Sequence, residues 1–104
     1  MRESTYHIFF GNLANPLRID IILALREKGK NVSQLIKELK VEQSKLSHAL
    51  RGLRNCHLVN VSKNGKERVY SLNRKTILPI LKIIEEHARE FCNAQCKQCS
   101  CFKE

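Results

Sequence analysis

Four of the five cysteines in this sequence lie within the ten residues "CNAQCKQCSC". A helix through this stretch would place Cys92, Cys96 and Cys99 on one face, because they are spaced by four and three residues, with Cys101 just beyond. Thiolates that converge in this way bind soft ions. Three would suit arsenite, and four would suit Zn²⁺ or Cd²⁺ in a tetrahedral shell, or an iron–sulfur cluster. We therefore expect a metal or metalloid site at Cys92, Cys96, Cys99 and Cys101.

Three other roles for this cluster stay open. Two of the thiols could form a disulfide under oxidation, which would make the protein redox-responsive. The four could instead hold a structural zinc ion, or they could belong to a tail without a role. The fifth cysteine, Cys56, stands alone, and a lone cysteine is most often a small buried apolar residue.

The composition predicts a single folded domain with a polyanionic partner. The chain has 104 residues, of which 42% are hydrophobic and 28% are charged, as is usual for globular domains. Domains this short often gain stability by dimerising. Lysine and arginine outnumber aspartate and glutamate by 19 to 10, and the resulting net charge of +9 favours a nucleic-acid partner.

Several classes of protein are disfavoured by the sequence. No apolar run is long enough to cross a membrane, and the N-terminal residues "MRESTYHIFF" lack the pattern of a signal peptide. We therefore expect a cytoplasmic protein with reduced thiols and no membrane partner. The sequence has no glycine-rich phosphate loop and no convincing pair of nucleophile and base, so we expect no enzymatic activity.

The positive charge is concentrated in the middle of the chain, between Gln43 and Ile84. Between Gln43 and Ile84 there is one acidic residue, Glu67, against nine basic residues: Lys45, Arg51, Arg54, Lys63, Lys66, Arg68, Arg74, Lys75 and Lys82. A regional surplus of this size predicts a basic surface rather than an evenly charged one.

Three helices are predicted before this basic region. In "STYHIFFGNL" the apolar residues share one helical face, and in "NPLRIDIILALREKG" Asn15 is a helix cap, Pro16 stands in the first turn and Gly29 ends the helix. The segment "NVSQLIKELK" follows, and Ser33 is its expected cap.

The next segment, "EQSKLSHALRGLRNC", predicts a fourth helix with two different faces. Its apolar residues Leu46, Ala49, Leu50 and Leu53 recur at helical spacing and should be buried. The opposite face carries side chains that hydrogen-bond base edges and phosphates: Gln43, Ser44, Lys45, Ser47, His48 and Arg51.

From Leu58 the apolar residues alternate, which predicts two strands, "LVNVSK" and "ERVYSL". Between them Asn64 and Gly65 favour a type I′ hairpin turn. Lys63, Lys66 and Arg68 cluster at its tip. From Thr76 helical spacing returns, with Pro79 in the first turn and one apolar stripe: Ile77, Ile80, Leu81, Ile84, Ala88 and Phe91.

This order of elements predicts a mainly α fold with a small β-hairpin, a winged helix-turn-helix. In that fold the recognition helix enters the major groove while the hairpin contacts the DNA alongside. The phrases "LANPLRIDIILAL", "VSQLIKEL", "QSKLSHALRGLRNCHLV" and "SKNGKERVYSL" occur in the order typical of the ArsR/SmtB family of metal-responsive repressors, which this sequence resembles from about Phe9 to Leu72. The resemblance implies a homodimer, formed by the first and last helices, that binds double-stranded operator DNA until an inducer lowers its affinity.

The sequence departs from two metal sites known in that family. Asn31 and Ser33 stand where cysteines flank a valine at the start of the third helix. His87 and Glu90 match half of a zinc site in the last helix, but its other half is missing, so we interpret His87 as a surface histidine. The resemblance also places His57 where the family usually has glycine, and we expect it to strain the turn after the recognition helix. His48 is expected to contact DNA, and His7 has no evident partner.

Together these patterns predict a winged helix-turn-helix domain over residues 1–91 and a cysteine-rich tail over residues 92–104. The predicted function is a transcriptional repressor that leaves its operator when the tail cysteines bind a soft ion. The alternative is a redox-responsive or constitutive DNA-binding regulator whose cysteines form a disulfide or hold structural zinc. The two hypotheses differ in whether metal changes the affinity for DNA.

Overall fold

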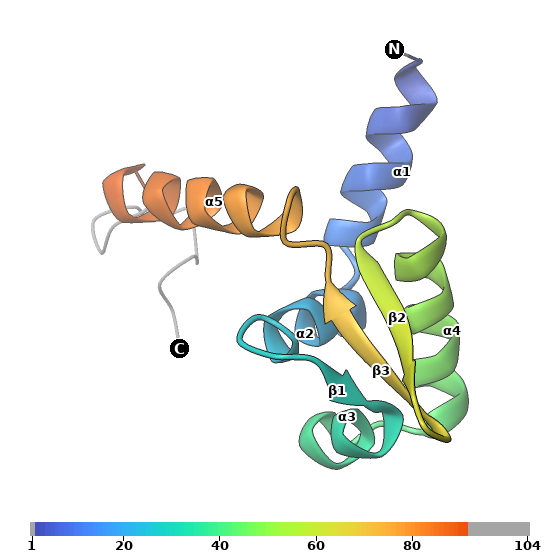
Figure 1. The fold of residues 1–104 in the computed structure, drawn as a ribbon. Coiled ribbons are helices and arrows are strands. Elements are labelled where there is room, and N and C mark those ends of the chain that lie inside the picture. The colour runs from blue at the N-terminus through green and yellow to red at the C-terminus, as the bar shows by residue number, and fades with distance from the viewer. Residues whose placement is uncertain (1, 92–104) are drawn as a thin grey trace. The chain divides into compact units, whose positions relative to one another are not determined.

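The computed structural model describes residues 2–91. Its elements, in chain order, are α1 (Glu3–Leu13), α2 (Pro16–Ala24), β1 (Lys30–Asn31), α3 (Val32–Leu39), α4 (Gln43–Asn55), β2 (Val59–Asn64), β3 (Glu67–Leu72) and α5 (Ile77–Phe91) (Figure 1). One compact unit extends to Asn73 and a second begins at Arg74. The predicted cysteine site lies outside the described residues, as does the predicted tail. The mainly α fold with a hairpin is confirmed.

The sheet of the first unit has three strands rather than the two that the sequence predicted. Its order is β1-β3-β2 and both pairs are antiparallel. The added strand β1 has two residues, Lys30 and Asn31, which pair with Tyr70 and Val69. Strand β3 is therefore central, and its backbone is paired along both edges at Val69 and Tyr70.

The hairpin turn differs from the predicted type I′ turn. Asn64 pairs with Glu67, so the two loop residues are Gly65 and Lys66. Gly65 has φ of 69°, and among residues 2–91 the only other residues with positive φ are Lys40 and His57. A turn with positive φ only at its first central position is of the type II′ class, in which glycine takes that place. The predicted loop was one residue too early.

Helix α2 ends at Ala24, five residues before the predicted stop at Gly29, although Asn15 caps it as predicted by accepting from the Arg18 N–H at 3.1 Å. Gly29 has a different role. A Cβ there would lie 2.9 Å from Val69 Cγ1 and 3.0 Å from the Tyr70 carbonyl oxygen. The absence of a side chain therefore lets the chain approach β3 closely enough to form β1.

The cap of α3 is Asn31, not Ser33. The Asn31 side chain accepts from the Gln34 N–H and the Gln34 side chain accepts from the Asn31 N–H, both at 2.8 Å. This reciprocal pair is a capping box, which satisfies two backbone donors. Ser33 lies inside the helix. Because Asn31 is also in β1, the start of α3 is fixed to the sheet.

The core of the first unit is formed by apolar side chains from helices α2, α3 and α4 and from the sheet. The predicted buried face of α4 is confirmed, since Leu46, Ala49, Leu50 and Leu53 are all at most 4% exposed. They pack with other buried residues of this unit: Ile21, Ile22, Leu25, Leu35, Leu58, Val59, Tyr70 and Leu72. The core fixes α4 with one face inward, so its opposite face is free to bind.

Helices α1 and α5 each expose apolar side chains. On α1, Tyr6, Ile8 and Phe10 are each more than half exposed. On α5, Pro79 lies in the first turn as predicted, and Ile83, Ile84 and Phe91 are 64%, 50% and 62% exposed. Within residues 2–91, no helix is both long and apolar enough to cross a membrane.

Candidate nucleic-acid interface

The predicted recognition face of α4 is exposed over its whole length. All six of its residues are classed as exposed: Gln43, Ser44, Lys45, Ser47, His48 and Arg51. They form two groups. Ser44, Lys45 and His48 border a hollow beside the start of α2, whereas Ser47 and Arg51 line a hollow that also includes residues of the hairpin. Both groups lie on the polar face opposite the core, as helical spacing requires.

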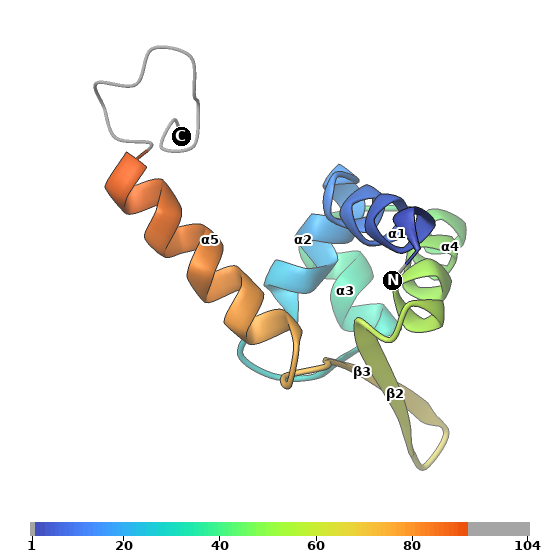
Figure 2. The same ribbon diagram turned by 90° about the horizontal axis from the view of Figure 1, so that it is seen from above.

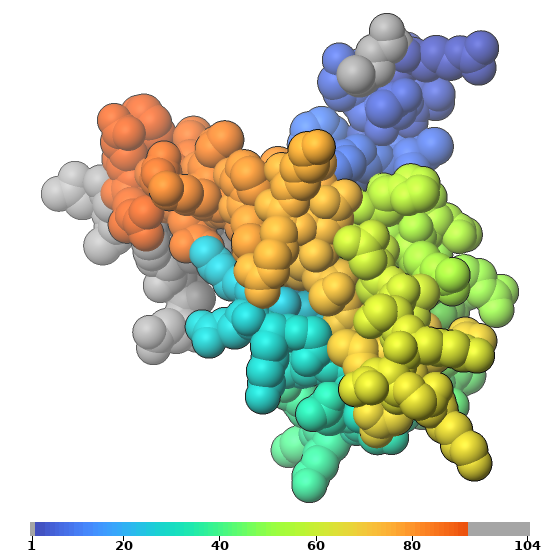
Figure 3. Space-filling view, viewed as in Figure 1, coloured from blue at the N-terminus to red at the C-terminus, as the bar shows by residue number. Residues whose placement is uncertain are grey.

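The hairpin β2–β3 carries the second predicted group, Lys63, Lys66 and Arg68, all exposed. It projects away from the helices (Figure 2) and forms one side of the first unit together with α4 (Figure 3). Lys63 and Arg68 are direct cross-strand partners. Like charges in that position destabilise a hairpin, so their presence favours a polyanion as partner.

The one acidic residue of the hairpin, Glu67, is held by a neutral group. Its Oε1 accepts a hydrogen bond from Asn31 Nδ2 at 3.1 Å. Elsewhere in the unit a basic group is neutralised directly, since Lys30 Nζ lies 2.5 Å from Glu38 Oε1. The basic side chains of the hairpin have no such recorded ion pair among residues 2–91. The hairpin therefore keeps its positive charge.

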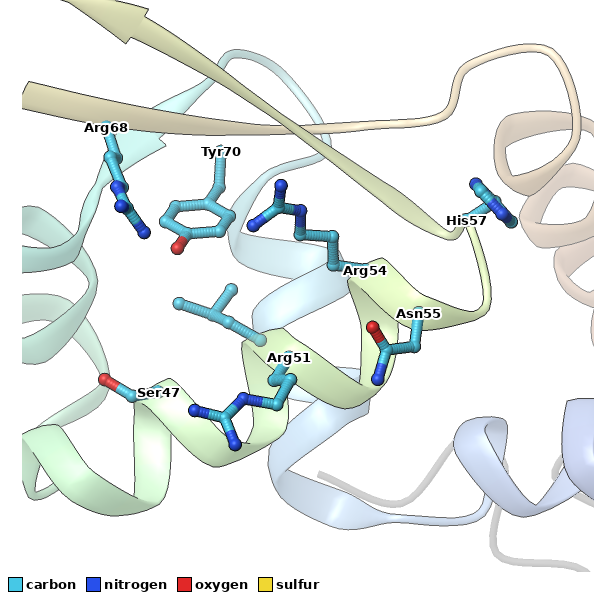
Figure 4. Close-up of a pocket in the computed structure, with 8 residues that line it drawn as sticks. Ser47, Arg51, Arg54, Asn55, His57, Arg68 and Tyr70 are labelled. Atoms are coloured by element: carbon cyan, nitrogen blue, oxygen red, sulfur yellow. The ribbon is translucent and has the colours of Figure 1, made fainter.

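A hollow of about 480 Å³ separates α4 from β3 (Figure 4). It is lined by Ser47, Leu50, Arg51, Arg54, Asn55, His57, Arg68 and Tyr70. Three of the predicted residues meet there, Ser47, Arg51 and Arg68, while the other six do not line it. Sequence reasoning missed Arg54 and Tyr70. Arg54 could have been found, because it follows Ser47 by seven residues and Arg51 by three on one helical face.

The turn after α4 contains the residue expected to be strained. His57 has φ of 59°, in the left-handed region where glycine is usual, which confirms that expectation. Its N–H donates to the Arg54 carbonyl at 3.0 Å, and the Leu58 N–H donates to the Leu53 carbonyl at 2.9 Å. These two bonds form a Schellman motif, and Leu53 and Leu58 are both buried beside it. The motif ends α4 sharply despite the missing glycine.

Three helices meet in a polar junction behind α4. Asn12 of α1 is 3% exposed, and its Nδ2 donates to Cys56 Sγ at 3.1 Å and to the Ile8 carbonyl at 3.2 Å. Its Oδ1 accepts from Arg18 Nη1 of α2. Cys56 is thus a half-buried acceptor and not the buried apolar residue that was predicted. A Cβ on Gly52 would lie 2.4 Å from Arg18 Nη2, so α4 has glycine where the guanidinium crosses it.

The histidines do not form a metal site within the described part of the chain. His7 lies 3.5 Å from Glu3 Oε1 one turn away, a partner that the sequence analysis did not identify. His87 is an exposed side chain, as predicted, and its ring lies 5.0 Å from that of Phe91. No group of three potential ligands exists among residues 2–91.

Comparison with known sequences matches residues 15–61, which extend from the cap of α2 into β2, to the profile described as "Bacterial regulatory protein, arsR family". Two similar curated proteins are the transcriptional repressor SmtB homolog of Synechocystis, 33% identical over 79% of this chain, and the HTH-type transcriptional regulator NmtR of Mycobacterium tuberculosis, 43% identical over 58% of it. The chain spans 62% and 50% of the lengths of these two relatives.

A third relative is similar in both sequence and structure. The uncharacterised HTH-type transcriptional regulator Rv0081 of Mycobacterium tuberculosis is 33% identical over 72% of this chain and 67% of its own length. Its crystal structure superposes with a TM-score of 0.78, covers 84% of this chain and 88% of the other, and shows 28% identity. The similarity thus extends well beyond the residues that match the profile.

Proposed function

Because the chain belongs to the arsR family of bacterial regulatory proteins, we propose that it is a homodimeric repressor that binds double-stranded operator DNA. One observation carries the proposal. The exposed polar face of α4 lies beside a hairpin that bears three basic side chains and a single acid, and that acid is held by Asn31. Such a surface has the charge and the shape that a duplex requires.

The two elements have different tasks in this proposal. Helix α4 enters the major groove, where Ser47 and Arg51 hydrogen-bond base edges and so read sequence. The hairpin lies along the backbone, where Lys63 and Lys66 neutralise phosphates. The core residues of α4 hold the helix so that its reading face cannot rotate away from the DNA.

A second subunit is proposed because α1 and α5 each expose apolar side chains that are costly to leave in water. Phe10 on α1 and Phe91 on α5 are both more than 60% exposed. Burying an aromatic side chain of this kind contributes about 1.5–3 kcal/mol. Two copies would also present two copies of α4 to a palindromic operator.

Release from the operator is proposed to depend on Cys92, Cys96, Cys99 and Cys101. The spacing of these cysteines in the sequence and the chemistry of their thiols support this role. A bound soft ion would link these thiolates to one another. The finer identity of the ion, arsenite, Cd²⁺ or Zn²⁺, is a question for titration.

The proposal is tested by selecting bound duplexes from a random library with the reduced protein and then following release by fluorescence anisotropy. We expect dimer binding to a palindrome and release by one soft ion at about three or four thiols per site. Replacing Cys96 and Cys99 with serine should leave the affinity intact and abolish release. The matched control is Cys56→Ser, which should still be released. Failure of the wild-type protein to prefer any duplex would refute repression by operator binding.

A further inference from the structure

The hollow between α4 and β3 has a composition that separates it from the other hollows of the first unit. It holds three arginines, Arg51, Arg54 and Arg68, and no carboxylate. By contrast, the basic hollow beside α3 includes Glu38, which pairs with Lys30, and the one that Asn31 and Lys66 line includes Glu67. The hollow beside the start of α2 has no carboxylate either, but no arginine lines it. None of the three guanidinium groups has a recorded ion pair or hydrogen bond among residues 2–91.

Tyr70 points to a ligand independently of this charge. It belongs to the central strand and is 8% exposed, so its ring is fixed by the core. Its hydroxyl has no recorded hydrogen-bond partner in the described part of the chain and points from the strand toward α4 (Figure 4). No buried side-chain nitrogen or oxygen among residues 2–91 lacks a partner, so the Tyr70 hydroxyl itself reaches the surface of the hollow, where it can donate to a bound molecule. Here the donor is aimed into a hollow that three guanidinium groups also line.

The arrangement around Tyr70 matches the chemistry of a phosphate group. In Figure 4 Arg54 reaches up from α4 on one side of the Tyr70 ring, and Arg68 hangs from β3 on the other. Guanidinium groups bind phosphate oxygens bidentately, and a phenol adds a third donor. Backbone phosphates also flank the groove where the C-terminal part of a recognition helix leaves it, and Arg54 is the last residue but one of α4.

We propose that this hollow is a phosphate site, in which Arg54, Arg68 and the Tyr70 hydroxyl bind one backbone phosphate of the DNA. This inference rests on the proposed function and extends it, because Arg54 and Tyr70 become DNA-contacting residues that fix the position of α4 on the duplex without reading its sequence. The large volume of the hollow leaves room for the sugar attached to that phosphate.

The test compares three variants in anisotropy titrations over a range of salt concentration, on an operator and on an unrelated duplex. Arg54→Gln removes one charge, so it should weaken both complexes and lower the slope of log affinity against log salt by about 0.9. Tyr70→Phe should weaken binding about tenfold on both duplexes without changing the slope, because it removes a neutral donor. Lys28→Gln is the charge-matched control, since Lys28 is exposed outside α4 and the hairpin, and it should change neither quantity.

A scan with methylphosphonate linkages then identifies the phosphate. One position in each half-site should weaken the wild-type protein when neutralised but leave Arg54→Gln unaffected. A wild-type slope for Arg54→Gln, or the absence of such a position, would overturn the site while leaving operator binding intact. If the wild-type protein bound no duplex, the proposed function would fail instead. The phosphate site would then be tested by NMR titration of the wild-type protein with pyrophosphate. The amide resonances of Arg54 and Arg68 should shift, and unchanged resonances would overturn the site.

Discussion

The polar junction of Asn12, Arg18 and Cys56 behind α4 leads to a prediction about Gly52→Ala: it should lower stability in the wild-type protein and raise it in a variant that lacks Arg18. In Gly52→Ala the new methyl group would lie 2.4 Å from Arg18 Nη2 and 2.6 Å from its Cζ, so the guanidinium must move. Its movement breaks the hydrogen bond to Asn12 Oδ1. Because Asn12 is 3% exposed, that oxygen would be left buried without a partner.

The magnitude follows from two opposing terms. An unsatisfied buried acceptor costs about 1–3 kcal/mol. Alanine in a helix is favoured over glycine by about 1 kcal/mol. We therefore expect Gly52→Ala to lower the free energy of unfolding by about 1 kcal/mol. In an Arg18→Leu background nothing obstructs the methyl group and the bond is already absent, so the same change should raise stability by about 1 kcal/mol, a coupling of about 2 kcal/mol between the two sites.

Urea unfolding followed by circular dichroism measures all four proteins of this cycle. Protomer concentration must be equal throughout, because dimerisation stabilises the folded state by mass action. If Gly52→Ala stabilised both backgrounds alike, Arg18 would not be held against α4 by Asn12, and the junction would contribute nothing to the position of the helix.

Two other substitutions test backbone positions. Gly29→Ala should lower the free energy of unfolding of the first unit by about 1–3 kcal/mol, because its methyl group would meet the Tyr70 carbonyl, a backbone atom that cannot rotate away. If thermal unfolding showed an unchanged midpoint, β1 would not need this close approach. His57→Gly should instead raise stability by about 0.5–1 kcal/mol by relieving a left-handed residue, and a fall in the unfolding midpoint would mean that the histidine side chain contributes more than its backbone strain costs.

The sequence predicted those helices and strands in which apolar residues recur at a regular spacing. The face of α4 that packs in the core has apolar residues at helical spacing, and the hairpin strands alternate, so both were predictable from a period. Strand β1 has two residues and therefore no period to detect. It forms because Gly29 lets the chain approach β3, which is a tertiary effect that no local pattern encodes.

Residues of the candidate site were predictable where a single helix or hairpin supplies them, and not where residues from different elements come together. Ser47 and Arg51 are polar residues on the helical face opposite the apolar one, and the basic residues of the hairpin lie on either side of the Asn64-Gly65 turn sequence. The role of Tyr70 could not be predicted, because alternation identifies it as a core residue and says nothing about the direction of its hydroxyl. Asn12 was missed for a similar reason, since a single asparagine in an apolar helix does not reveal that Arg18 and Cys56 will meet it.

The C-terminal end of α4 is held by more hydrogen bonds from other parts of the first unit than its N-terminal end. At its start Glu42 makes no capping hydrogen bond through its side chain, whereas its last turn is held by the Asn12–Arg18 junction and by the Schellman motif at His57. Asn73, the last residue of the first unit, adds two more bonds: its Nδ2 donates to the His57 carbonyl at 2.9 Å and its N–H donates to the Leu58 carbonyl at 3.0 Å.

This asymmetry suits a helix whose first turns must fit into a groove. In the proposed complex the side chains in the first turns of α4 adapt to base edges, while its C-terminal end is held by hydrogen bonds from Asn12 and Asn73. Both hydrogen bonds of Asn73 end on the turn that stops α4. The turn that ends α4 is therefore tied to the last residue of the first unit.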